Sequence, residues 1–187
     1  MKFVSFNYDR CLEQYLIYSL AVRFNIPIQE AQKLLIKNPV LHAYGSIDPL
    51  ATWHGGSGSV FGAEQGYDLR ESWKNIKTFS EEIDVNDEQL TAIRIAIAKA
   101  DRLVFLGFAF HQPNMRLLDP GIRIRAKQIY ATAFGMSLND RQLIEQELQN
   151  EWGAHDRDSG IHGKPAITIV DQTCEKFMAD YQRTLMS

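Results

Sequence analysis

Five short apolar segments, each followed by a helical pattern, constrain the fold of this chain more than any other feature. They occupy residues 3–6, 40–44, 103–106, 128–134 and 166–170. In the segments between them, apolar residues recur at spacings of three and four, as on one face of a helix. Strands that alternate with helices are typical of a parallel sheet with crossover connections. We therefore predict an α/β fold with a mostly parallel sheet of about five strands.

The helical patterns predict where the layers that cover the sheet come from. Helices are expected over residues 10–23, 31–36, 87–99, 115–118, 138–149 and 173–185. Asn86 is the expected N-cap of the third helix, and Ser137 of the fifth. Hydrophobic residues make up 45% of the 187 residues, enough for one well-packed core. We predict a single Rossmann-like three-layer domain over residues 1–187.

Residues 48–68 form the irregular region of the chain. They include the glycine-rich run Trp53–Ser59, which lacks the lysine and hydroxyl ending of a phosphate-binding P-loop. A flexible surface loop and a lid that faces a ligand are both consistent with this composition.

Bulk properties exclude several classes of protein. The net charge is −3 and the basic residues are scattered, so no nucleic-acid partner is expected. No stretch approaches 18 continuous apolar residues, so no membrane span is expected either. Cys11 and Cys174 are far apart in sequence, which argues against a disulfide framework and a cysteine zinc site. A cytoplasmic location fits this cysteine usage.

Polar and glycine residues follow three of the predicted strands. Asn7 and Asp9 follow the first, His42 and Tyr44–Ser46 close the second, and Gly107–Asn114 follow the third. Parallel strands place their carboxyl ends at one edge of the sheet, where ligands bind in α/β proteins. These residues are therefore the candidate site.

Structural roles compete with this interpretation at each position. Asp9 is a good helix cap, and Asn7 is able to satisfy the backbone of a turn. His42 suits a general base at neutral pH, but a buried, hydrogen-bonded histidine is the commoner role at such a place. Gly107 permits either close approach of a ligand or tight packing of strand on helix.

The remaining histidines lie in predicted loops. His155 and His162 stand near Asp156 and Asp158, a composition that suggests a metal site. A hydrated loop without a supporting scaffold favours a solvated surface instead. No metal site is predicted.

Three segments together resemble the sirtuin-like family (the silent information regulator two superfamily) in its divergent bacterial branch. Asn7-Tyr8-Asp9 resembles its Asn-x-Asp motif, and His42–Ile47 is similar to its His-Gly-Ser segment. Leu103–Phe110 resembles its strand that ends in a glycine beside the cofactor ribose. The family's amino-terminal strand and Gly-rich turn would precede residue 1, so the likeness covers the later two thirds of such a domain. Two strands of the expected sheet would then be lacking.

The resemblance implies binding of oxidised nicotinamide adenine dinucleotide (NAD) and cleavage of its nicotinamide–ribose bond. In the divergent bacterial branch this hydrolysis is associated with antiphage defence. Asn7 would position the ribose and the attacking water, Asp9 would support the nicotinamide end, and His42 would act on the ribose hydroxyls. The cofactor contacts that the resemblance implies are Tyr44, Gly45, Ser46, Gly107, Phe108 and Asn114.

Two departures from the family refine this expectation. If Gly45-Ser46 align with the family's Gly-Ser, Tyr44 stands at the catalytic histidine position and His42 lies two residues earlier. No paired cysteines of the family's zinc ribbon follow His42, so neither zinc nor protein deacylation is expected. The alternative is an inactive interaction subunit that pairs through an open sheet edge, as a homo-oligomer or with a partner chain.

Overall fold

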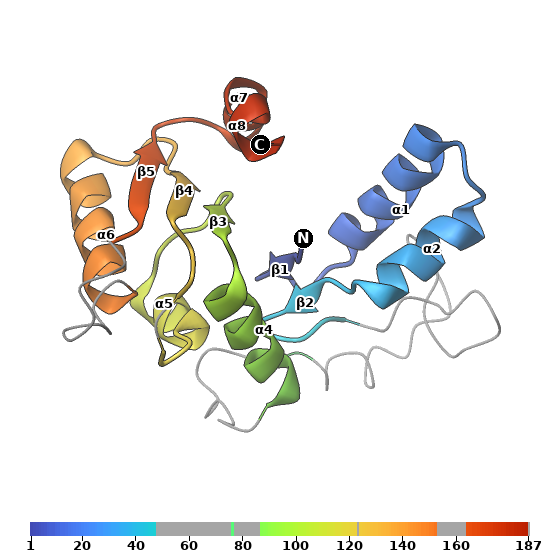
Figure 1. Ribbon diagram of the computed structural model, residues 1–187, viewed down its shortest axis with the longest axis horizontal. Coiled ribbons are helices and arrows are strands. Elements are labelled where there is room, and N and C mark those ends of the chain that lie inside the picture. The colour runs from blue at the N-terminus through green and yellow to red at the C-terminus, as the bar shows by residue number, and fades with distance from the viewer. Residues whose placement is uncertain (48–75, 77–86, 123, 153–163, 187) are drawn as a thin grey trace. The chain divides into compact units, whose positions relative to one another are not determined.

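The computed structural model describes residues 1–47, 76, 87–122, 124–152 and 164–186, which are coloured in Figure 1. By its internal contacts the chain divides into two compact units, Met1–Ile93 and Arg94–Ser187. The boundary falls within helix α4 (Glu88–Lys99). The irregular region at 48–68 lies outside the described residues, and the single domain over 1–187 stays a prediction.

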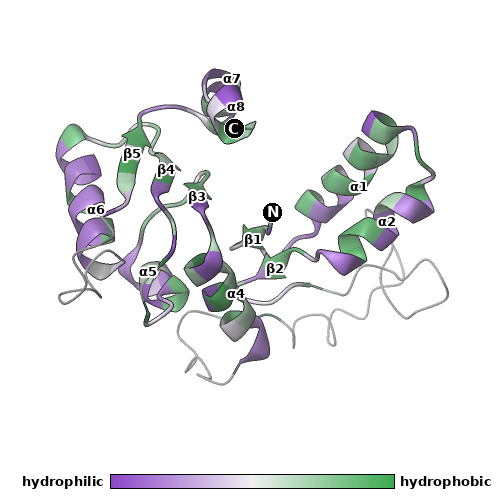
Figure 2. Ribbon diagram, in the orientation of Figure 1, coloured by the Kyte–Doolittle hydropathy of each residue, from purple (hydrophilic) through white to green (hydrophobic). Residues whose placement is uncertain are grey.

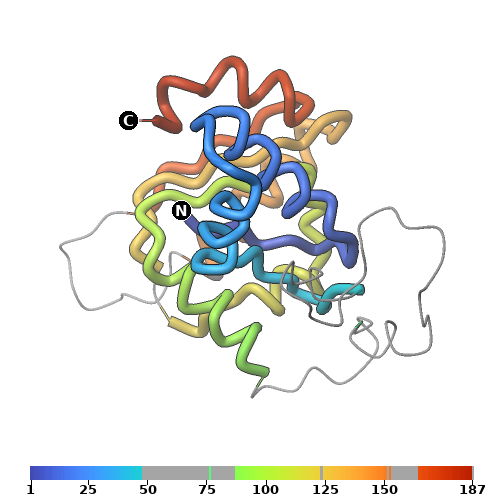
Figure 3. The backbone as a smooth tube through the Cα atoms, turned by 90° about the vertical axis from the view of Figure 1, so that its right-hand side faces the viewer, coloured from blue at the N-terminus to red at the C-terminus, as the bar shows by residue number. Residues whose placement is uncertain are grey.

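The first unit joins two short parallel strands through a pair of helices. β1 (Val4–Ser5) pairs with β2 (Leu41–His42), and α1 (Cys11–Phe24) and α2 (Ile28–Lys37) connect them. The two helices lie side by side, as Figure 3 shows, and enclose the core of this unit. This core contains Ile17, Ala21, Ala31, Leu35 and Val40.

Helix α1 buries a different face from the one its leucines suggest. The fully buried residues are Glu13, Ile17 and Ala21, at spacings of four, while the leucines on either side are partly buried. Tyr15, three residues after Leu12, is 69% exposed. The helix ends at Asn25, whose left-handed backbone (φ 49°) lets its N–H bond to the carbonyls of Ala21 and Val22.

The second unit contains a three-stranded parallel sheet. β3 (Arg102–Phe105) pairs with β4 (Gln128–Thr132), which pairs with β5 (Ala166–Val170) (Figure 1). Its helices are α5 (Gln112–Leu118), α6 (Leu138–Glu151), α7 (Cys174–Asp180) and α8 (Gln182–Met186). Figure 2 shows hydrophobic residues along β5 and a largely hydrophilic α6. Parallel pairing of strands joined by helices confirms the α/β class.

Burial identifies β4, and not β3, as the central strand of this sheet. Ile129 to Thr132 are all buried, whereas Val104 in β3 is 39% exposed. A continuously apolar run such as 103–106 is typical of a strand covered on both faces, but within this sheet β3 has one neighbouring strand and Val104 is partly exposed. β4, in contrast, has a strand on each side.

Two differences from the predicted helices concern a cap and the continuity of a helix. The carboxylate of Asp87 accepts the N–H groups of Gln89 and Leu90 at 2.7 and 3.2 Å, so Asp87 caps α4, and Asn86 lies outside the described residues. The predicted helix over 173–185 is two helices that meet at Tyr181. Ser137 caps α6 as predicted, since its hydroxyl accepts the N–H of Asp140.

Five strands are present, but in two sheets of two and three strands within the described ranges. A single five-stranded sheet therefore stays a prediction. No helix in the described part of the chain is long and apolar enough to cross a membrane.

Candidate functional site

The carboxyl ends of β1 and β2 bring together several of the predicted site residues. The backbone ladder between the strands runs through the N–H of Leu41 to the carbonyl of Phe3, and the N–H of Ala43 to the carbonyl of Ser5, both at 2.9 Å. Beyond it, the Nδ1 atom of His42 lies 2.8 Å from the carbonyl oxygen of Asn7. The first two predicted strand ends thus meet, as expected for parallel neighbours.

His42 is fully engaged by the protein on both sides of its ring. Its Nε2 atom lies 2.7 Å from the Oε1 atom of Glu13, and both side chains are almost completely buried. Arg10 adds a third member, with its guanidinium 3.2 Å from the same Glu13 oxygen and 3.0 Å from the Ser46 hydroxyl. Two roles were predicted for His42, a catalytic base and a buried, hydrogen-bonded histidine. The structure shows the buried, hydrogen-bonded arrangement.

The charge balance of this cluster favours an ionised Glu13. Burial by itself would raise the pKa of Glu13, because a carboxylate loses hydration in the interior. The hydrogen bond from His42 and the positive charge of Arg10 outweigh burial, and the pKa lies below its ordinary value of 4.5. Glu13 is thus an anion placed between two hydrogen-bond donors.

Asp9 acts on the start of helix α1. Its Oδ1 atom accepts the N–H of Cys11 at 2.9 Å, one of the donors that a helix start leaves without an intrahelical partner. This bond lowers the pKa of Asp9 below its ordinary value of 3.8, and the nearby His42 lowers it further. The N-cap of α1 is Arg10, without a side-chain cap bond, so Asp9 is not the N-cap that the sequence predicted, although its carboxylate does accept the first helical N–H.

Asn7 presents its carboxamide to solvent. The residue is exposed, its N–H donates to the Ser5 hydroxyl at 3.1 Å, and its carbonyl is held by His42. Its side chain makes no hydrogen bond with any described residue. The backbone of Asn7 is thus held by hydrogen bonds, while its carboxamide has no hydrogen-bond partner among the described residues. We call this carboxamide uncommitted.

Tyr44 and Gly45 form the turn after β2. Tyr44 is buried against the rings of Phe6 and Tyr8, with centroids 5.7 and 6.5 Å away. Burial, and then the neighbouring Tyr8, raise the pKa of Tyr44 above 10.0, which makes it still less suited to act as a base. Gly45 adopts φ 76° and turns its N–H back to the carbonyl of His42 at 3.2 Å.

Gly107, Phe108 and Asn114 lie in the second unit. Gly107 follows β3 with φ 61°, and its N–H donates to the Thr132 hydroxyl at 2.9 Å. A Cβ at this position would meet the Cys174 sulfur at 3.6 Å, an ordinary contact, so backbone conformation and not tight packing requires glycine here. The ring of Phe108 packs against the rings of Phe105 and Phe110, and Asn114 lies in α5.

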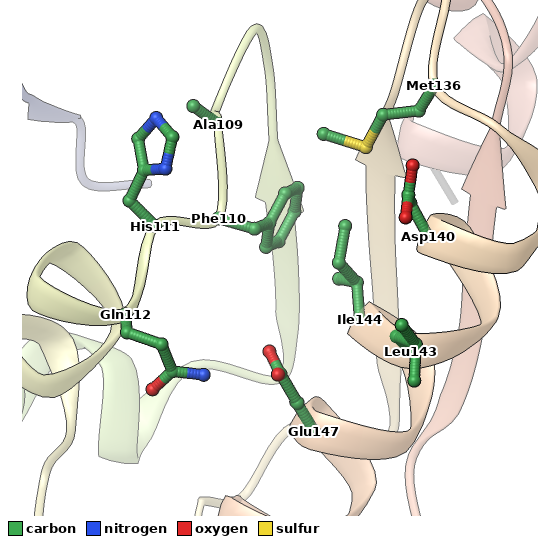
Figure 4. Close-up of a pocket in the computed structure, with 9 residues that line it drawn as sticks. All are labelled: Ala109, Phe110, His111, Gln112, Met136, Asp140, Leu143, Ile144 and Glu147. Atoms are coloured by element: carbon green, nitrogen blue, oxygen red, sulfur yellow. The ribbon is translucent and has the colours of Figure 1, made fainter.

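A pocket of about 370 Å³ lies at the carboxyl ends of β3 and β4, as Figure 4 shows. Its apolar wall includes Phe110, Leu143 and Ile144, and α6 also contributes the carboxylates of Asp140 and Glu147. Phe110 adopts φ 54°, an uncommon backbone conformation for a bulky residue. The predicted Gly107 and Phe108 lie immediately before the pocket in sequence but do not line it.

Sequence reasoning missed two members of the site in the first unit, Arg10 and Glu13. A signal for Glu13 was available, because it lies four residues before Ile17 and eight before Ala21 on the face that α1 buries. An acidic residue on a buried helix stripe requires a partner. The nearest strand-end residue that can donate to it is His42.

The histidine loop that suggested a metal site, at residues 155–162, lies outside the described residues, as does His54. Elsewhere, the described ranges contain no group of three or more histidine, cysteine or acidic residues placed to hold a metal ion.

Comparisons with protein-family models, with curated proteins and with solved structures gave no match to this chain.

Proposed function

We propose that this chain is a sirtuin-like domain that binds NAD and hydrolyses its nicotinamide–ribose bond. The observation that carries the proposal is the turn after β1. It presents the uncommitted carboxamide of Asn7 next to the ionised Asp9, at the carboxyl edge of two parallel strands. Carboxylate and amide oxygens at this edge suit a ligand with hydroxyl groups and developing positive charge.

The chemistry that such a site performs is a single displacement at the ribose carbon. The glycosidic C–N bond breaks, nicotinamide leaves with the electron pair, and water forms the new C–O bond and releases its proton. Positive charge builds up on the ribose as the bond breaks, and placed oxygens of Asn7 and Asp9 stabilise it. The exposed carboxamide of Asn7 also orients the water and the ribose hydroxyls.

The residues after β2 and β3 complete the proposed cofactor contacts. Tyr44, Gly45 and Ser46 adjoin the Asn7 turn in the first unit, and Gly107, Phe108 and Asn114 follow β3 in the second. We include in the proposal that the five strands belong to one Rossmann-like sheet. Support comes from the parallel pairing of the strands within each of the two sheets. A role in prokaryotic defence follows from the resemblance and depends on this hydrolase activity.

Release of free nicotinamide is the direct test. The purified chain is incubated at high concentration with NAD, and nicotinamide is followed by chromatography for wild type, Asn7→Ala and Asn139→Ala. Asn139 is also an exposed asparagine, but it lies on α6. We expect release by wild type and Asn139→Ala and its loss in Asn7→Ala. Equal release by Asn7→Ala, or none by a folded wild type, would overturn the proposal.

A second candidate function is that of an inactive subunit that pairs through a sheet edge. It is favoured by β5, which is hydrogen-bonded to β4 on one side and has no second partner strand among the described residues. Light scattering tests it: an assembly larger than a monomer supports it, and a monodisperse monomer contradicts self-association.

A further inference from the structure

The register of β1 and β2 identifies a gap in their backbone hydrogen bonding. Donors on the second strand follow the pattern Leu41 to Phe3 and Ala43 to Ser5, so the next bond would join the N–H of Gly45 to the carbonyl of Asn7. Gly45 turns away and donates to His42 instead. The His42 side chain replaces Gly45 as the hydrogen-bond partner of the Asn7 carbonyl, with its Nδ1 atom 2.8 Å from the carbonyl oxygen.

The partners of His42 determine its protons. A carbonyl oxygen only accepts, so Nδ1 must carry a hydrogen. On the other side, Nε2 faces the Glu13 carboxylate at 2.7 Å, so that contact also requires a proton, on the ring or on the acid. Arg10, 3.2 Å from the same oxygen, favours the carboxylate form of Glu13.

We infer that Glu13 is a positioning residue for the proposed reaction. Its carboxylate fixes the ring of His42, and the other ring nitrogen holds the Asn7 carbonyl where the strand ladder stops. The N–H of Ile47 donates to the next carbonyl along the chain, that of Tyr8, with an N···O distance of 2.9 Å. Hydrogen bonds to two successive carbonyls thus fix the backbone of Asn7, which presents the carboxamide. We name the series Glu13, His42 and the Asn7 carbonyl the clamp.

This inference rests on the proposed function for its effect on catalysis, but the clamp itself is a separate claim. With both ring nitrogens occupied, His42 supports Asn7 and does not itself take a proton from the ribose. The ionisable groups around the ring are Glu13 and Arg10 from the first turn of α1 and the residue before it, and Asp9 from the preceding turn. The phenols of Tyr8 and Tyr44 lie in the adjoining turns.

The clamp is tested without turnover by nuclear magnetic resonance. The ¹⁵N shifts of the His42 imidazole report which nitrogens carry hydrogen, and we expect Nδ1 to carry one in wild type, as its contact with the Asn7 carbonyl requires. In Glu13→Gln the negative charge is lost but the size is kept, and we expect hydrogen on Nδ1 alone. A wild-type ring with an unprotonated Nδ1 would overturn the inference.

Amide exchange and kinetics then measure what the clamp does. We expect segment 5–10 to exchange at least about tenfold faster in Glu13→Ala than in Glu30→Gln, a control at an exposed glutamate of α2. Nicotinamide release should fall about 10–100-fold in kcat with little change in KM, because a small misplacement of Asn7 affects the transition state most. Glu13→Gln should retain more activity than Glu13→Ala.

The outcomes separate the two claims. A folded wild type that releases no nicotinamide contradicts the proposed function, while the imidazole shifts and the exchange rates still decide the clamp. Unchanged exchange of segment 5–10 in a folded Glu13→Ala would contradict the clamp, whatever the turnover. Should Glu13→Ala fail to fold, Glu13→Gln gives the same comparison through its ring shifts and its kcat.

Discussion

The Nε2 atom of His42 lies 2.7 Å from the Oε1 atom of Glu13, with 1% and 3% of the two side chains exposed. A pair this deeply buried is costly to break, because removal of one partner leaves the other desolvated and unpaired. The stability of the first unit and the position of Asn7 therefore depend on the same two side chains.

Removal of His42 should destabilise the protein strongly. His42→Leu leaves the Glu13 carboxylate buried with Arg10 as its remaining partner, and we expect a loss of about 3–5 kcal/mol in the free energy of unfolding. Urea denaturation at pH 7 measures it. The double variant with Glu13→Leu should lose less than the sum of the single variants, because the two residues interact. Additive losses would show that the pair is not coupled.

Acid should weaken the folded state through Glu13. Its pKa is lower when folded than the ordinary 4.5, so the folded state binds this proton less readily than the unfolded chain. The resulting stability is fully present above about pH 4.5 and is lost as the pH falls through the lower, folded value. Denaturation midpoints measured across the acid range should fall less steeply in Glu13→Gln than in wild type. Parallel profiles would contradict this assignment.

Loss of the Asp9 carboxylate should weaken the start of α1. Asp9→Ala removes the acceptor of the Cys11 N–H, and we expect a cost of about 0.5–2 kcal/mol, the range for helix-capping side chains. Asp9→Asn keeps an oxygen acceptor and should cost less. Chemical denaturation of both variants checks this, and equal losses would show that charge and not the hydrogen bond matters.

Substitution of Gly107 should act through the backbone. Gly107→Ala forces a Cβ onto a residue with φ 61°, which costs about 1–2 kcal/mol by left-handed strain. Gly107→Asn should be milder, because asparagine tolerates this conformation better. Thermal and urea unfolding of the two variants provide the measurement. An alanine variant as stable as wild type would contradict the strain argument.

The sequence predicted the elements and the direction of the strands because these depend on local patterns. Apolar runs of four to seven residues followed by helical spacing were enough to predict parallel pairing, and parallel pairing was enough to predict that Asn7 and His42 meet. Strand order was not predicted, because an apolar run such as Leu103–Leu106 does not reveal how many neighbouring strands it has. Strand order is a tertiary property.

Only the tertiary structure decided what His42 and Asp9 contact. From its position in the sequence, His42 was consistent with either a free base or a hydrogen-bonded core residue. The choice between these roles depends on which groups pack against the ring. Helix α1 turns Glu13 inward beside Ile17, and Gly45 withdraws its N–H from the strand ladder. Together they leave both ring nitrogens of His42 facing acceptors. The sequence thus determined which polar residues gather at the strand ends, and packing between distant segments determined which of them remain free for a ligand.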